Sequence, residues 1–107
     1  MELASVLVVA PRAQYLDLRN TAEFKSDMAL LLAHHTRIVL DLYRVETVDS
    51  SAIGAFVSCL KRVLPRGGDL KLCCLAAEVR TIAELTKLHR IVEIWNTREE
   101  AIRAFGI

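Results

Sequence analysis

Apolar residues along the chain gather in short blocks that alternate between the spacing of strands and that of helices. Four blocks are nearly continuous and of strand length: SVLVVA at 5–10, RIVLDL at 37–42, DLKLCCL at 69–75 and IVEIW at 91–95. Such runs are typical of strands that are covered on both faces, as in a parallel sheet. A further short strand is predicted at YLDL, 15–18, where it would form an N-terminal hairpin with the first.

Between these blocks, apolar residues recur at the spacing of one buried helix face. The last predicted helix runs through Phe105, with Gly106 where a C-terminal cap would lie. The other three predicted faces consist of Phe24, Met28, Leu31 and Leu32; Ile53, Phe56, Val57, Leu60 and Leu64; and Val79, Ile82, Leu85 and Leu88.

Capping signals stand at the expected helix ends. The sequences N-x-x-E at 20–23 and T-x-x-E at 97–100 are capping boxes that would open the first and last helices. Asp49 or Ser50 is expected to cap the second helix, because either side chain can accept hydrogen bonds from the free amides of the first turn. The sequence PRGG at 65–68 is expected to end that helix.

The alternation of strands and helices predicts an α/β sandwich around a central mixed, largely parallel sheet of about four or five strands, with about four helices. A length of 107 residues suits one domain, so residues 1–107 are expected to form a single unit. In such folds, ligands and partners meet the carboxyl ends of the strands and the amino ends of the helices that follow.

The composition argues against a nucleic-acid-binding protein and against a membrane protein. The apolar content of 53% and the charged content of 25% are ordinary for a globular protein. The formal net charge is only +1, so the protein has no strong electrostatic field to attract nucleic acid or an anionic membrane. The longest apolar runs, 28–33 and 72–77, fall far short of the ~20 residues that span a bilayer. No basic leader precedes the first apolar block. We therefore expect a cytoplasmic protein with no direct nucleic-acid contact and no membrane insertion.

The three cysteines, Cys59, Cys73 and Cys74, lie within apolar runs and show no C-x-x-C or Cys/His ligand spacing. We interpret them as buried free thiols in a reducing compartment. Neither a metal site nor a bound cofactor is expected.

The stretch VDSSAIGAF, 48–56, places two serines directly after an aspartate at the start of the second predicted helix. Three interpretations are open at this point: a helix cap, a hydrolytic nucleophile and a phosphorylation site. If Asp49 or Ser50 is the cap, Ser51 falls in the first helical turn, where its hydroxyl would have no structural task and could face solvent.

Catalysis is the weakest of these interpretations. A hydrolase elbow reads G-x-S-x-G, and no glycine stands two residues before either serine. His34, His35 and His89 are expected at the opposite ends of helices from the serines. A phosphoaspartate receiver is also disfavoured, because no acidic pair ends the first strand to hold a magnesium ion. The protein is therefore not expected to be an enzyme.

Phosphorylation has a physical case. The amino end of a helix offers free N–H groups and the positive end of the macrodipole, so it accepts an added anion without unfolding. A phosphate would carry about −1.5 to −2 charges at neutral pH. It would reverse the formal net charge of +1 and place charge and bulk on a surface that otherwise meets a partner.

The runs IVLDLYRVETVDSSAIGAF, GGDLKLCCLAAEVRTIAEL and IVEIWNTREEAIRAF resemble the STAS domain of bacterial anti-sigma factor antagonists over residues 38–105. The segment YLDLRNTAEFK is similar to the family's first helix region. The most specific part is a D-S-S/T-G-L-G-type motif, which DSSAIG at 49–54 matches. Ala52 stands where the family often has glycine, and the glycine of its N-terminal hairpin is not evident in PRAQYLD.

The resemblance implies a partner-switching function. Ser51 would be phosphorylated by a GHKL-type anti-sigma serine kinase, which binds the unphosphorylated chain and is released on phosphorylation. A PP2C-type phosphatase would reset the cycle. The alternative is a constitutive STAS interaction subunit of a transport or signalling complex, in which the two hydroxyls only cap the helix and seat a partner.

The predicted partner-binding residues surround this motif. Asp17 and Arg44 are expected on loops near the Ser51 end of the sheet, where they could contact a partner. The simpler interpretation of each is a charged side chain that is exposed to solvent and has no partner. Asp49 is expected to orient Ser51 or to be read by the kinase. The full predicted set is Asp17, Arg44, Asp49, Ser50, Ser51 and Ile53.

Overall fold

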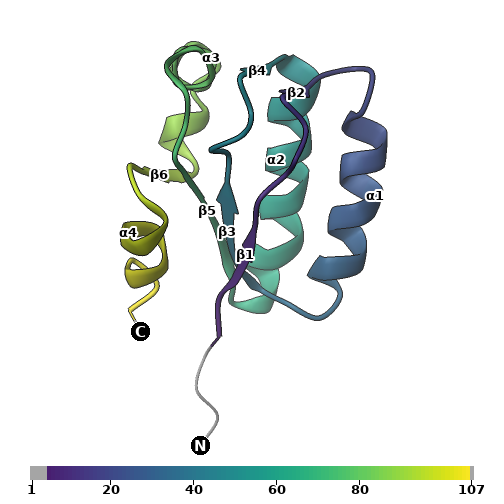
Figure 1. Ribbon diagram of the computed structural model, residues 1–107. Coiled ribbons are helices and arrows are strands. Elements are labelled where there is room, and N and C mark those ends of the chain that lie inside the picture. The colour runs from purple at the N-terminus through teal and green to yellow at the C-terminus, as the bar shows by residue number, and fades with distance from the viewer. Residues whose placement is uncertain (1–4, 107) are drawn as a thin grey trace, which may run out of the picture.

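Strands and helices alternate along residues 5–106, the part of the chain that the computed structural model describes (Figure 1). No helix within these residues is both long enough and apolar enough to cross a membrane. The elements are β1 (Leu7–Val9), β2 (Tyr15–Leu16), α1 (Thr21–Leu32), β3 (Arg37–Asp41), β4 (Thr47–Val48), α2 (Ser50–Val63), β5 (Asp69–Cys73), α3 (Ala77–Leu85), β6 (Glu93–Trp95) and α4 (Arg98–Arg103), with short 3₁₀ turns at Leu64–Arg66 and Leu88–Arg90.

Four of the strands form one sheet in the order β1-β3-β5-β6, and β2 and β4 form a separate two-stranded sheet. The predicted α/β fold with four helices and a four-stranded sheet is confirmed. Every strand pair within residues 5–106 is parallel, so the sheet is not mixed over that range.

The predicted N-terminal hairpin is wrong. Tyr15 and Leu16 pair with Thr47 and Val48 of β4, a strand that the sequence did not predict. A tight hairpin needs a reversing turn of the Asn-Gly or Asp-Gly kind. The sequence PRAQ at 11–14 supplies none, and the chain continues upward from β1 to β2 instead of reversing (Figure 1).

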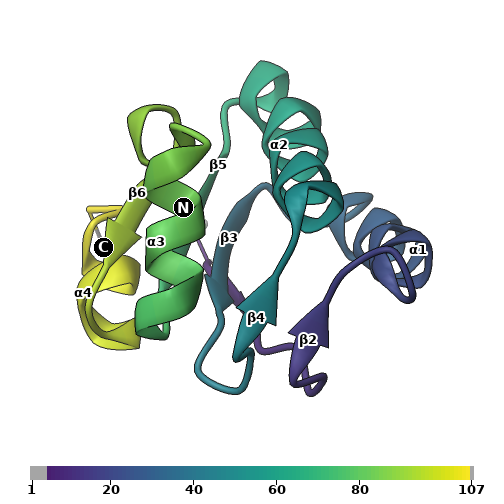
Figure 2. The same ribbon diagram turned by 90° about the horizontal axis from the view of Figure 1, so that it is seen from above.

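Two helical layers enclose the four-stranded sheet. Helices α1 and α2 pack side by side on one face, and α4 packs on the other (Figure 2). Successive strand residues face opposite layers. Ile38 and Leu40 therefore join the larger core under α1 and α2, whereas Val39 joins a smaller core under α4.

The predicted helix faces are mostly buried, with two exceptions. Leu64 is 50% exposed and Leu85 is 72% exposed, so both predictions of a core position are wrong. Helix α2 ends at Val63, which is buried, and Leu64 begins a 3₁₀ turn that carries it off the helix face. Leu85 is the last residue of α3, and Leu88 in the following turn is buried in the core.

The two capping-box sequences behave differently. At α4 the box is confirmed, because Thr97 Oγ1 accepts from the Glu100 amide at 3.1 Å and Glu100 Oε1 accepts from the Thr97 amide at 3.0 Å. At α1 the predicted box is wrong, since Asn20 makes no side-chain capping bond. Its side chain accepts from the Asp17 amide and donates to the Tyr15 carbonyl instead.

Two glycines complete the turn between α2 and β5, as predicted. Gly67 adopts φ +79°, in the left-handed region that favours glycine. Gly68 lies against the chain before β3, where an added Cβ would fall 1.9 Å from the Thr36 carbonyl oxygen.

Candidate functional site

The DSS stretch lies where three segments meet, at the amino end of α2. Strand β4 leads directly into this helix, and its neighbour β2 leads into the turn before α1 (Figure 2). The Asp49 amide donates to the Leu16 carbonyl at 3.2 Å, which extends the β2–β4 pairing to the first residue of the cap. The start of α2 and the turn before α1 are therefore held as one unit.

Asp49, one of the two residues predicted for this role, is the N-cap of α2, and Ser50 is the first residue of the helix. Its Oδ1 accepts from the Ala52 amide at 3.1 Å and from the Ser51 hydroxyl at 2.5 Å. Its Oδ2 accepts from the Leu18 amide at 3.1 Å. The hydrogen bond from Ser51, followed by those from the backbone amides, holds the pKa of Asp49 below its ordinary value.

Ser51 does not have the free, solvent-facing hydroxyl that the sequence suggested. The residue is half-buried, its hydroxyl donates to Asp49, and its oxygen accepts from Thr21 Oγ1 at 3.3 Å. Thr21 opens α1 and is itself buried, so it reaches Ser51 from across the helix pair. Ser50 is the exposed serine of the two.

Asp17 lies in the turn before α1, as expected. Its carboxylate accepts from Arg19 Nε at 3.1 Å and from Nη2 at 2.8 Å, and the Arg19 guanidinium lies 3.7 Å from the centroid of the Tyr15 ring. The side-chain hydrogen bonds from Arg19 lower the pKa of Asp17. Asp17 therefore shapes a turn that is linked to Asp49 through Leu18.

Two predicted partner contacts differ in how accessible they are. Arg44 is exposed in the loop between β3 and β4, with its guanidinium 5.2 Å from the Tyr43 ring centroid. Ile53 is only 8% exposed and packs in the larger core, so it offers a partner little surface.

Two residues of this region were not predicted from the sequence. Leu18 is 81% exposed although its backbone is bonded to Asp49, and a leucine within the polar turn D-L-R-N was the available signal. Thr21 gave no sequence signal, because its contact with Ser51 joins residues thirty positions apart.

The other candidate side chains lie elsewhere. His34 and His35 follow the carboxyl end of α1, whereas Thr21 at its amino end contacts Ser51. Cys59 and Cys73 are buried as predicted, but Cys74 is only half-buried.

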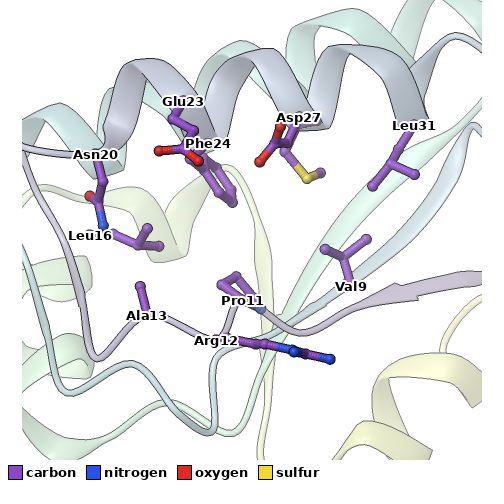
Figure 3. Close-up of a pocket in the computed structure, with 11 residues that line it drawn as sticks. Val9, Pro11, Arg12, Ala13, Leu16, Asn20, Glu23, Phe24, Asp27 and Leu31 are labelled. Atoms are coloured by element: carbon purple, nitrogen blue, oxygen red, sulfur yellow. The ribbon is translucent and has the colours of Figure 1, made fainter.

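A cavity of about 330 Å³ lies between α1 and the segment that joins β1 to β2 (Figure 3). Glu23 and Asp27 line it from α1, and Arg12 lies on the opposite side. None of the predicted partner-binding residues lines it, so it is separate from the Ser51 region. Its lining residues are Val9, Pro11, Arg12, Ala13, Leu16, Asn20, Glu23, Phe24, Asp27, Met28 and Leu31.

Comparison with known proteins gives a consistent result. The model of the STAS domain family matches residues 2–101. The chain is 32% identical over 99 residues to a Thermotoga maritima protein whose provisional name is anti-sigma factor antagonist, with 91% of this chain and 87% of the relative covered. A crystal structure of a T. maritima protein with the same provisional name has a TM-score of 0.82 at 32% identity, covering 91% of this chain and 86% of that one.

More distant structures share the fold. The anti-sigma factor antagonist SpoIIAA in its unphosphorylated form has a TM-score of 0.80 at 22% identity, with 100% of this chain and 94% of that one covered. Its phosphorylated form from Bacillus gives 0.69 at 19%, covering 98% and 95%. The murine anion transporter Slc26a9 gives 0.79 at 17%, covering 95% of this chain and 18% of the transporter.

Proposed function

Because this chain belongs to the STAS domain family, we propose that it acts as an anti-sigma factor antagonist controlled by phosphorylation of Ser51. The unphosphorylated chain binds an anti-sigma factor that is also a GHKL-type serine kinase. Phosphorylation of Ser51 by that kinase dissociates the complex, and a PP2C-type phosphatase restores the binding form.

The observation that carries this proposal is the position of Ser51 in the first turn of α2, beside its N-cap Asp49. A phosphate at this position lies at the positive end of the helix dipole, which favours an anion. The helix itself therefore tolerates the modification.

The same phosphate acts on the cap. It removes the Ser51 hydroxyl proton that Asp49 now accepts, and it places a second anion beside that carboxylate. Repulsion between the two anions weakens the hold of Asp49 on the Leu18 amide. Because that bond ties the turn before α1 to the start of α2, modification loosens the surface and charges it at the same time.

The exposed residues around Ser51 suit a protein partner. Leu18, whose amide is bonded to Asp49, is 81% exposed, and a leucine this exposed beside the cap offers an apolar contact to a partner. Ser50 and Gly54 are also exposed and lie one helical turn apart. Because both residues are small, no large side chain projects from this part of α2. A partner seated on this surface would have to bury the added phosphate, which costs several kcal/mol when the charge is left unpaired.

A constitutive interaction subunit is the competing function, and the bonds of Ser51 are the observation that favours it. Both the donor and the acceptor capacity of the hydroxyl are used within the fold, as expected of a serine that only locks the helix start. The fold-level likeness to part of an anion transporter is compatible with such a subunit.

Phosphosite mapping by mass spectrometry on the protein isolated from its own cells separates the two functions. We expect phosphate on Ser51, its loss in Ser51→Ala and its retention in Ser50→Ala, which is the matched control because the two hydroxyls are adjacent. Two results would favour the constitutive subunit: phosphate that remains in the Ser51→Ala variant, or wild-type protein that carries no phosphate under any growth or stress condition.

A further inference from the structure

The carboxyl ends of β3 and β5 bring together three side chains that the Ser51 region does not use. They are Asp41, Cys73 and Cys74, and one carboxylate oxygen and the two sulfurs all lie within 4.8 Å of one another. We propose that this cluster binds a thiophilic divalent cation, Zn²⁺ in particular. Metal binding at this cluster would not require phosphorylation of Ser51.

The backbone is arranged so that two adjacent cysteines can share a ligand. Successive side chains of a strand point to opposite faces, so Cys73 and a strand-like Cys74 would diverge. Strand β5 ends at Cys73, and Cys74 adopts φ +62°, a left-handed conformation that is uncommon for residues other than glycine. The strand therefore breaks at the residue whose thiol joins the cluster.

The donor set matches the chemistry of zinc. Thiolate sulfur and carboxylate oxygen are both common zinc ligands, and three protein ligands leave a fourth, tetrahedral position for water or another donor. Calcium and magnesium are poor fits, because they bind oxygen rather than sulfur.

Arg98 balances the charge of such a site. Its Nε donates to Asp41 Oδ2 at 2.8 Å, and the Tyr43 amide donates to Oδ1 at 3.1 Å. A carboxylate has about four lone-pair positions, so each oxygen keeps one for a metal. Two thiolates and one carboxylate carry three negative charges, which the cation and the Arg98 guanidinium together neutralise.

Burial gives the cluster a dry interior and one open side. Asp41 and Cys73 are 3% and 0% exposed, whereas Cys74 is half-buried and the Arg98 side chain is 43% exposed. A cation can therefore enter past Cys74 and Arg98. The fixed partners of Asp41 hold its carboxylate in place, as is usual for metal ligands.

Metal titration of the purified, reduced full chain tests the proposal, with Co²⁺ as the spectroscopic probe and Zn²⁺ as its competitor. We expect one Co²⁺ per chain, a thiolate-to-cobalt charge-transfer band, and displacement of Co²⁺ by Zn²⁺. Cys74→Ser should lower the affinity by about tenfold or more and weaken the band. Cys59→Ser is the matched control, since Cys59 lies on α2 under the opposite face of the sheet, and it should bind like the wild type.

Three results would overturn the proposal: wild-type protein that binds no Co²⁺, a spectrum without the thiolate band, or Cys74→Ser that binds as tightly as the wild type. X-ray absorption on the zinc-loaded wild type needs no variant and guards against a folding defect. A first coordination shell with two sulfurs supports the site, and a shell of oxygen and nitrogen alone excludes it.

Discussion

The Ser51 hydroxyl donates a 2.5 Å hydrogen bond to Asp49, the residue that caps the helix on which Ser51 lies. The same carboxylate accepts from the Leu18 amide in the turn before α1. Any group that replaces the Ser51 proton therefore acts on both segments, because it changes what Asp49 can hold.

Two substitutions of Ser51 should separate the effect of added negative charge on kinase binding from the effect of losing the hydroxyl. Ser51→Asp places a carboxylate beside Asp49 and is expected to weaken binding of the anti-sigma kinase by ~10-fold or more, equivalent to about 1.4 kcal/mol. Ser51→Ala adds no charge and should bind nearly as well as the wild type. Isothermal titration calorimetry with the kinase measures both, and equal affinities for the two variants would contradict the proposed switch.

The cap predicts a dependence of stability on pH. Hydrogen bonds to the carboxylate hold the pKa of Asp49 in the folded chain below its ordinary value of 3.8. The stabilisation is therefore present above about pH 3.8 and is lost as the pH falls through the folded-state pKa. Asp49→Asn can still accept at the N-cap but does not titrate there.

Urea unfolding of the wild type and Asp49→Asn at several pH values checks this prediction. The difference in free energy of unfolding should be constant near neutral pH and should become less favourable to the wild type at strongly acidic pH. A difference that grows in favour of the wild type as the solution becomes more acidic would show that Asp49 is not held as its carboxylate.

Gly54 offers a test of the proposed docking surface. It is an exposed residue inside α2, and an added Cβ would meet nothing within 4 Å. Gly54→Ala should therefore stabilise the free protein by about 0.5–1 kcal/mol. It should also weaken the kinase complex, because the methyl group lies one turn from Ser50 on the surface that a partner would cover.

Thermal unfolding and calorimetry together measure the two effects of Gly54→Ala. Ser26→Ala, an exposed change on α1, is the control that should leave kinase binding unaltered. Unchanged binding by Gly54→Ala would move the docking surface away from this part of α2.

The two glycines before β5 should differ in their tolerance of alanine. At Gly68 the new Cβ would fall 1.9 Å from the Thr36 carbonyl oxygen, so the backbone must shift, and we expect a cost of about 3 kcal/mol. At Gly67 no atom lies within 4 Å of the new Cβ, and only the left-handed backbone is penalised, by about 1–2 kcal/mol. Chemical denaturation of both variants measures the difference, and the reverse order would contradict it.

Local sequence signals predicted the parts of the fold that depend on local contacts. The capping box at Thr97 and the cap at Asp49 formed because each bond joins residues two or three positions apart. At Asn20 the local signal did not produce a cap, because the side chain makes two hydrogen bonds to the preceding turn instead.

Contacts between distant segments were not predictable from one sequence. Strands β2 and β4 have two residues each, too few for a pattern that names a partner, and their pairing joins segments more than thirty residues apart. The bond from Thr21 to Ser51 also joins residues thirty positions apart, so the hydroxyl that was expected to be free is bonded. Adjacent cysteines likewise gave no ligand spacing, because the turn of the chain at Cys74 brings the two thiols together.

The pairing of β2 with β4 makes the Ser51 region a discontinuous epitope. Leu18 and Thr21 come from one segment and Asp49 and Ser51 from another, and they are neighbours only in the folded chain. A kinase that recognises this surface would require the folded conformation. A peptide of the VDSSAIGAF stretch contains only one of the two segments and would therefore be a poor substrate. Modification would then be confined to chains that have already folded.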